Sequence, residues 1–123
     1  MSERTLHRGV CDYLRYRWPG TMFNTDLSGA TKLTKGQAGA MKNLRSQRGY
    51  PDLVIYEPRA GYHGLFIELK KEGTRLYKIN GEPATEHIAE QMECLLELRS
   101  RGYKAEFAVG FDQAQEIIDN YLK

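Results

Sequence analysis

The segment from residue 49 to residue 70 constrains the fold more than any other part of this chain of 123 residues. It reads Gly-Tyr-Pro-Asp-Leu-Val-Ile-Tyr, then a turn of eight residues, then Leu-Phe-Ile-Glu-Leu-Lys. Branched and aromatic residues favour a strand on each side, and Pro58, Gly61 and Gly64 mark the reversal between them. Both strands are apolar enough to lie inside a sheet rather than at its edge. The segment therefore predicts a central β-hairpin.

The polar residues of this hairpin are spaced for a shared site. Successive side chains of a strand alternate between faces, so Glu68 and Lys70 lie on one face and their apolar neighbours on the other. Pro51 cannot donate to a sheet ladder and belongs at a strand start, which places Asp52 at the opening of its strand. The twist of the hairpin can then bring Asp52 beside Glu68.

A carboxylate pair beside a lysine suits metal-dependent chemistry on a phosphodiester. Two converging carboxylates repel, and one takes up a proton unless a cation compensates them. Mg²⁺ is usually held by one or two carboxylates, polarises a phosphate and lowers the pKa of a bound water. Lys70 could orient that water or neutralise the charge that develops on the phosphate. The alternative is an ordinary turn Asp before a strand with a solvated Glu-x-Lys face.

Together with Gln91 on a following helix that ends before Gly102 and Tyr103, these residues resemble the VRR-NUC (virus-type replication-repair nuclease) branch of the PD-(D/E)XK superfamily. The likeness spans nearly the whole chain. It implies an α/β fold with a restriction-endonuclease-like αβββαβ core, a mixed sheet flanked by helices, here followed by an extra C-terminal helix. It also implies a DNA nuclease dependent on Mg²⁺ or Mn²⁺. Short stand-alone members act as homodimers on branched DNA such as Holliday junctions.

The resemblance also implies roles for particular residues. Asp52, Glu68 and Lys70 match the catalytic triplet of the family, and Gln91 matches its helical glutamine. The carbonyl of the residue between Glu68 and Lys70, here Leu69, usually completes the metal shell.

Glu3 is the candidate for a further metal ligand, because the family tends to carry a Glu on its first helix. It falls on the same side of the predicted helix as Leu6 and Val10. The alternative is that Glu3 only complements the helix dipole after a Ser2 cap. His7 stands where the family more often has Gln.

The gap between Lys70 and Gln91 is longer than in the compact family pattern. Asn80-Gly81 predicts a small inserted hairpin over residues 77–83. After it, Thr85 is suited to cap the helix that carries Gln91 at the border of its apolar face. The alternative for Gln91 is an ordinary polar residue at that border.

Charge is distributed unevenly, although the net charge is only +2. Residues 27–51 carry no acidic side chain, whereas residues 74–123 carry six basic and nine acidic ones. Basic residues beside a metal site are where a DNA backbone would be bound. A loop with a short helix around Ala40 to Gln47 is expected there, and the alternative is a solvated surface loop. The candidate DNA contacts are Lys32, Lys35, Lys42, Arg45 and Arg48.

Length and composition predict a single nuclease-like domain over residues 1–123, since 41% hydrophobic content can supply one core but not two. No apolar run of transmembrane length and no signal peptide is present, so a cytoplasmic protein without membrane contact is expected. Cys11 and Cys94 lie far apart in sequence, which indicates reduced thiols rather than a disulfide or zinc site.

The expected order is a helix over 3–17, a strand over 22–25, the two hairpin strands, the Gln91 helix, a strand over 103–109 and a helix from Asp112. The functional hypothesis is a structure-selective DNA endonuclease. Two alternatives remain open: a non-catalytic DNA-binding or junction-scaffolding module of the same fold, and a nuclease for linear or single-stranded DNA ends. Phosphate contacts are common to all three.

Overall fold

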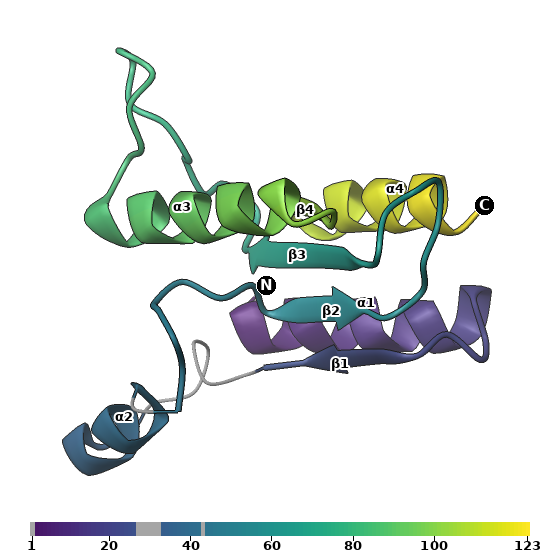
Figure 1. Ribbon diagram of the computed structural model, residues 1–123, viewed down its shortest axis with the longest axis horizontal. Helices are drawn as coiled ribbons and strands as arrows, with labels where there is room; N and C mark the ends of the chain where they lie inside the picture. The colour runs from purple at the N-terminus through teal and green to yellow at the C-terminus, as the bar shows by residue number, and fades with distance from the viewer. Residues whose placement is uncertain (1, 27–32, 43) are drawn as a thin grey trace.

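The computed structural model describes residues 2–26, 33–42 and 44–123. It confirms the predicted α/β order, which includes a helix, α2, in the basic segment (Figure 1). The elements in chain order are α1 (Glu3–Arg17), β1 (Phe23–Thr25), α2 (Lys35–Lys42), β2 (Leu53–Ile55), β3 (Leu65–Lys70), α3 (Glu86–Ser100), β4 (Lys104–Val109) and α4 (Phe111–Leu122). Within the described residues, no helix is both long and apolar enough to cross a membrane.

The four strands form one mixed sheet in the order β1-β2-β3-β4. β2 pairs antiparallel with β1 and with β3, whereas β3 and β4 are parallel. A parallel pair needs a crossover connection, and α3 supplies it. Because β2 and β3 have a neighbour on both sides, the prediction that the hairpin strands are central is confirmed.

The side chains of β3 alternate between two environments, as predicted. Leu65, Ile67 and Leu69 join the apolar faces of α1 and α4 in the hydrophobic core. Glu68 points to the other face, where it meets Gln91 of α3. The period of two along β3 therefore separates the core from the polar site.

The helix of the basic segment begins earlier than predicted. The expected range around Ala40 to Gln47 is wrong, because α2 spans Lys35–Lys42. Thr34 and Gln37 form a capping box that fixes its start: the Gln37 N–H donates to Thr34 Oγ1 at 3.1 Å, and the Thr34 N–H donates to Gln37 Oε1 at 3.0 Å.

The segment between β3 and α3 extends away from the sheet as an arm (Figure 1). Tyr77 and Pro83 form an antiparallel bridge, and the Lys78 N–H donates to the Glu82 carbonyl at 2.7 Å. The predicted inserted hairpin is thus confirmed. Thr85 caps α3 as expected, so the long insertion leaves the Gln91 helix intact.

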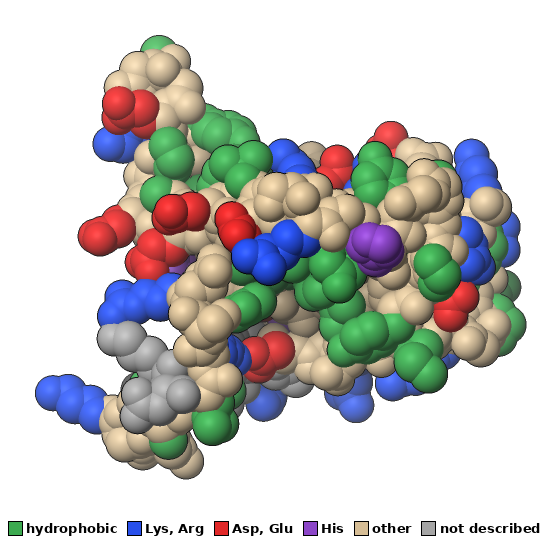
Figure 2. All heavy atoms as spheres, viewed as in Figure 1, with side chains coloured by type: hydrophobic (Ala, Val, Ile, Leu, Met, Phe, Trp, Pro, Cys, Tyr) green, Lys and Arg blue, Asp and Glu red, His purple; other side chains and the backbone are tan. Residues whose placement is uncertain are grey.

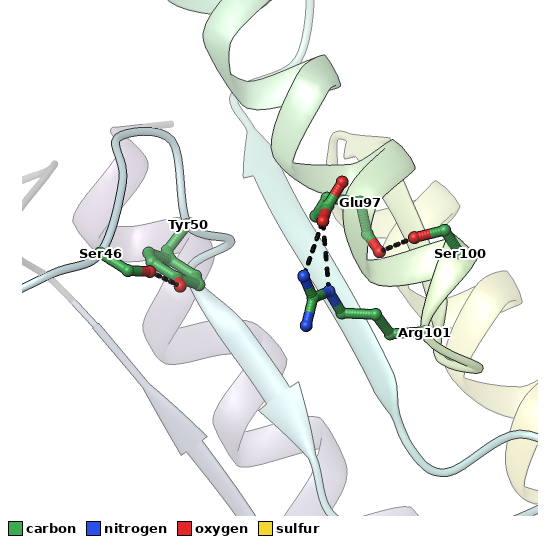
Figure 3. A network of polar contacts seen from close by, with 5 residues as sticks. All are labelled: Ser46, Tyr50, Glu97, Ser100 and Arg101. Carbon is green, nitrogen blue, oxygen red and sulfur yellow. Dashed lines mark hydrogen bonds and ion pairs between the residues drawn. The ribbon is translucent and has the colours of Figure 1, made fainter.

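The segment before β2 lies beside the C-terminal half of α3 (Figure 3). On the segment, the Ser46 and Tyr50 hydroxyl oxygens are 2.5 Å apart. On the helix side, Arg101 donates to Glu97 Oε1 through Nε at 3.2 Å and Nη2 at 2.8 Å, and Ser100 Oγ donates to the Glu97 carbonyl at 2.6 Å. The end of the basic segment is therefore placed against α3.

Gly49 fixes this segment to α3 at the height of Gln91. Its φ is +83°, and an added Cβ would lie 2.7 Å from the Glu90 carbonyl oxygen and 3.0 Å from the Gln91 Cα. We expect Gly49→Ala to lower the free energy of unfolding by about 2–5 kcal/mol, the combined cost of a strained φ and of overpacking. Denaturant titration measures this change.

The matched control is Gly81→Ala at the tip of the arm. Gly81 has a φ of +89° and open space around it. Only the backbone cost remains there, so we expect a loss of about 1–2 kcal/mol. Equal losses of stability in the two variants would show that close packing against α3 does not explain the glycine at position 49.

Candidate active site

Strand register places Asp52 opposite Glu68. β2 and β3 pair Leu53 with Ile67, so one residue further the register sets Asp52 against Glu68. Opposite residues in an antiparallel pair have Cβ atoms roughly 5 Å apart. The Asp52 backbone N–H donates to Glu68 Oε2 at 3.2 Å. The predicted convergence of the two carboxylates is confirmed.

Asp52 is held from three elements. The Leu69 N–H on β3 donates to Asp52 Oδ2 at 3.0 Å, and the Asp26 N–H at the end of β1 donates to the Asp52 carbonyl at 2.7 Å. From α1, His7 Nε2 lies 3.7 Å from Asp52 Oδ2. The carboxylate is therefore fixed at the end of the sheet, between the helices of its two faces.

Glu68 is buried, with 3% of its surface exposed. Gln91 Nε2 donates a hydrogen bond to Glu68 Oε1. Burial above all, then a hydrogen bond with the Asp52 side chain and the charge of Asp52, raise the pKa of Glu68 to about 10, while the charge of Lys70 and the hydrogen bond from the Asp52 backbone N–H oppose this shift. Without a cation, the carboxylate pair therefore retains a proton at neutral pH.

A divalent cation fits this pair. Among the described residues, no group of three or more His, Cys, Asp or Glu side chains could hold a metal. Mg²⁺ needs fewer, because one or two carboxylates together with waters and substrate phosphate oxygens usually hold it. The buried Gln91 Oε1 also has no hydrogen-bond partner within the described part of the chain, so a further oxygen atom at the site is unpaired there. Asp52 and Glu68 provide the hard oxygen donors that such a cation prefers.

Lys70 ends β3 on the Glu68 face of the sheet, with 8% of its surface exposed. Its carbonyl accepts the Gly110 N–H at 2.8 Å, which fixes the backbone at this end of the strand. The ammonium acts on Glu68 through its charge. The structure thus brings together Asp52, Glu68, Lys70 and Gln91, and their catalytic roles remain predictions.

Glu3 stands apart from this group. It is half-buried in the first turn of α1, and it does not form a three-carboxylate cluster with Asp52 and Glu68. Leu69 contacts the site through its N–H. Metal binding by Glu3 and by the Leu69 carbonyl stays a prediction.

His7 is a site residue that sequence reasoning did not assign. It is 3% exposed, and its Nδ1 has no hydrogen-bond partner among the described residues. The available signal was its spacing, since His7, Val10 and Leu14 recur three and four residues apart on the buried face of α1. The structure places the imidazole one helical turn beyond Glu3 and against Asp52.

Only part of the basic segment can be placed. Lys32 lies outside the described residues, and the side chain of Lys42 at the end of α2 is also not described. Lys35 is exposed at the start of α2. These three assignments to DNA stay predictions.

Arg45 and Arg48 lie near the site with acidic neighbours. Arg45 forms an ion pair with Asp26, whose N–H binds the Asp52 carbonyl. Arg48 Nη1 lies 3.9 Å from Glu90 Oε2, and both arginines line a hollow between the segment and α3. The segment therefore reaches the site, although these ion pairs offset part of its charge.

Metal binding is expected to release a proton. Glu68 keeps its proton in the metal-free protein, and a cation needs the ionised carboxylate. Between the ordinary pKa of 4.5 and the raised value of about 10, apparent Mg²⁺ affinity should rise up to about tenfold per pH unit. Calorimetric titration in buffers of different ionisation enthalpy measures the proton count.

The same shift predicts how metal-free stability depends on pH. A raised pKa in the folded state adds stability that is fully present below 4.5 and is lost as pH rises towards about 10. The free energy of unfolding should therefore fall by up to about 1.4 kcal/mol per pH unit in EDTA. Glu68→Gln is the control and should remove both effects. Mg²⁺ binding without proton release would contradict the protonated pair.

Comparison with known proteins supports the resemblance seen in the sequence. The structure matches a solved VRR_NUC domain protein at 26% sequence identity and a TM-score of 0.66, over 99% of this chain and 88% of that chain. No family model and no curated protein matches the sequence. The predicted VRR-NUC-like fold is confirmed, and it indicates a nuclease of the PD-(D/E)XK type.

Proposed function

We propose that this protein is a divalent-metal-dependent endonuclease that hydrolyses phosphodiester bonds in branched DNA such as Holliday junctions. The observation that carries the proposal is the carboxylate pair of half-buried Asp52, just before β2, and buried Glu68 on β3, with Lys70 on the same face. The VRR_NUC-like fold supports it, because a nuclease fold implies DNA binding.

Asp52 and Glu68 would hold the cation, with the Leu69 carbonyl and Glu3 as further candidate ligands. When bound, Mg²⁺ or Mn²⁺ would supply Lewis-acid polarisation of the scissile phosphate and a lower pKa for a coordinated water. Gln91 keeps Glu68 in place through its amide hydrogen bond. The leaving side of the bond is proposed to be the 3′ oxygen, which gives products with 5′-phosphate ends.

Lys70 would act on the reacting atoms. Its ammonium can donate hydrogen bonds to the attacking water or to a phosphate oxygen, and its charge offsets the charge that grows on the phosphate. Because Lys70 is nearly buried, that charge acts in a medium that screens it less than water does.

A homodimer is part of the same proposal. A four-way junction has approximate two-fold symmetry, and two cuts on it need two sites related by such an axis. One chain offers one Asp52–Glu68 pair. Two copies acting together would supply both cuts.

The test uses a labelled four-way junction, a matched linear duplex and a matched single strand, each with Mg²⁺, with Mn²⁺ and with EDTA. We expect metal-dependent cutting of the junction and little cutting of the other two. Equal cutting of all three would retain the nuclease and reject selectivity for branches. Binding without cutting under every condition would favour the non-catalytic scaffolding module.

A further inference from the structure

The exposed side of α1 carries a row of arginines. Arg4, Arg8 and Arg15 follow one another at four and seven positions, so they share one side of the helix. They line a hollow together with His7 and Thr25, which we call the α1 groove. None of these arginines belongs to the basic run at residues 27–51.

The α1 groove opens beside the carboxylate pair. His7, which lines the groove, has its Nε2 3.7 Å from Asp52 Oδ2. Thr25, on the β1 side, pairs in register with Leu53, the residue after Asp52. A ligand in the groove would therefore lie next to the atoms proposed to hold the cation.

Arg4 and Arg8 are the uncompensated charges of the groove. Both are exposed, and neither forms an ion pair or hydrogen bond with a described residue. Arg15 differs, because its Nη1 lies 3.3 Å from Asp12 Oδ1 and its guanidinium stacks 5.5 Å from the centre of the Phe23 ring. Two free guanidinium groups thus stand at the end of the groove nearest the start of α1.

Helix stability does not account for Arg4. It is the second residue of α1, where the helix dipole favours anions and opposes cations. Cations are favoured in the last turn, which holds Arg15 and Arg17. A cation kept exposed and unpaired in the first turn is better explained by an anionic ligand.

We propose that the α1 groove binds DNA phosphates beside the scissile bond, with Arg4 and Arg8 as the contacts. This inference rests on the proposed nuclease function and adds a second phosphate-binding segment. Arg45 and Arg48 would hold the backbone on the other side of Asp52. Figure 2 shows acidic side chains gathered over the start of α3, where Glu90 Oε2 lies 3.9 Å from Arg48 Nη1.

The test measures DNA affinity across a salt series, in a Lys70→Ala background that does not cut. Fluorescein-labelled duplex and four-way junction are titrated with Mg²⁺ present. Removing both contacts with Arg4→Ala/Arg8→Ala should weaken binding and reduce the slope of log affinity against log salt by about 2, close to one per lost phosphate contact. Duplex and junction should both show this change, because both present a phosphate backbone to the groove.

The matched control is Arg17→Ala/Lys123→Ala, which removes the same charge at the far end of α1 and at the C-terminus. It should leave the slope unchanged. An unchanged slope in Arg4→Ala/Arg8→Ala would overturn the proposal that the α1 groove binds DNA phosphates. Metal-dependent cutting that requires Asp52 would still support the proposed nuclease function. If the Lys70→Ala parent binds no DNA, both the groove proposal and the proposed nuclease function are overturned. Arg4→Ala alone should reduce the slope by about 1 without lowering Tm. This result would distinguish a lost phosphate contact from a loss of stability.

Discussion

Asp52→Asn is expected to reduce the rate of metal-dependent cleavage by about 10³-fold or more. Asn has the size of Asp, and its side-chain oxygen can still accept the Leu69 N–H that Asp52 Oδ2 accepts at 3.0 Å. It supplies no negative charge, and therefore binds a hard cation much more weakly. The variant removes the charge of the proposed metal ligand while it preserves the hydrogen bond that joins β2 to β3.

Single-turnover cleavage with protein in excess measures this effect independently of product release. Asp112→Asn is the control, because Asp112 is an exposed acid in the first turn of α4. It should cleave at the parent rate. The pKa of Glu68 should also fall in Asp52→Asn, since a neighbouring charge that raises it is gone. Cleavage by Asp52→Asn at the parent rate would reject Asp52 as a metal ligand.

The hairpin and its two faces could be predicted from the sequence because they depend on local patterns. A period of two along residues 65–70 separates Glu68 and Lys70 from the core, and Pro51 marks the strand start. The contact between Asp52 and Glu68 depends on more than this pattern. It requires the register that pairs Leu53 with Ile67, and a slip by one residue would separate the carboxylates.

The α1 groove could not be predicted from the sequence, because its residues are not consecutive. The basic run at residues 27–51 is visible as consecutive sequence, whereas Arg4 and Arg8 are separated by one helical turn and become neighbours only on a folded helix. His7 was likewise not assigned to the site from the sequence. Its burial against Asp52 depends on how α1 packs on the sheet, which no local pattern determines.

The position of α2 was missed although a local signal was present. Thr34 followed three residues later by Gln37 is a capping-box pattern, and it sets the helix start at Lys35. The glycines within this segment favoured a loop instead. A capping pattern therefore outweighed low intrinsic helix propensity here.

Lys70→Met is expected to lower the cleavage rate by roughly 10²–10³-fold while Mg²⁺ binding persists. Met has a similar length and no charge, so the variant loses the group proposed to serve the attacking water and the developing phosphate charge. The carboxylate pair itself stays, since Asp52 and Glu68 contact each other without Lys70. Burying a charge costs free energy, so its replacement by an apolar side chain should also leave thermal stability equal or higher.

Lys71→Met is the matched control, because it makes the same chemical change one residue further, at an exposed position beyond the end of β3. Cleavage rates and calorimetric Mg²⁺ binding are compared for both variants. A loss confined to cleavage in Lys70→Met assigns Lys70 to the chemical step. If Mg²⁺ binding and cleavage fall together, Lys70 instead helps Glu68 to lose its proton when the cation binds, since its charge lowers the pKa of that carboxyl. Equal rates in the two lysine variants would remove Lys70 from the site altogether.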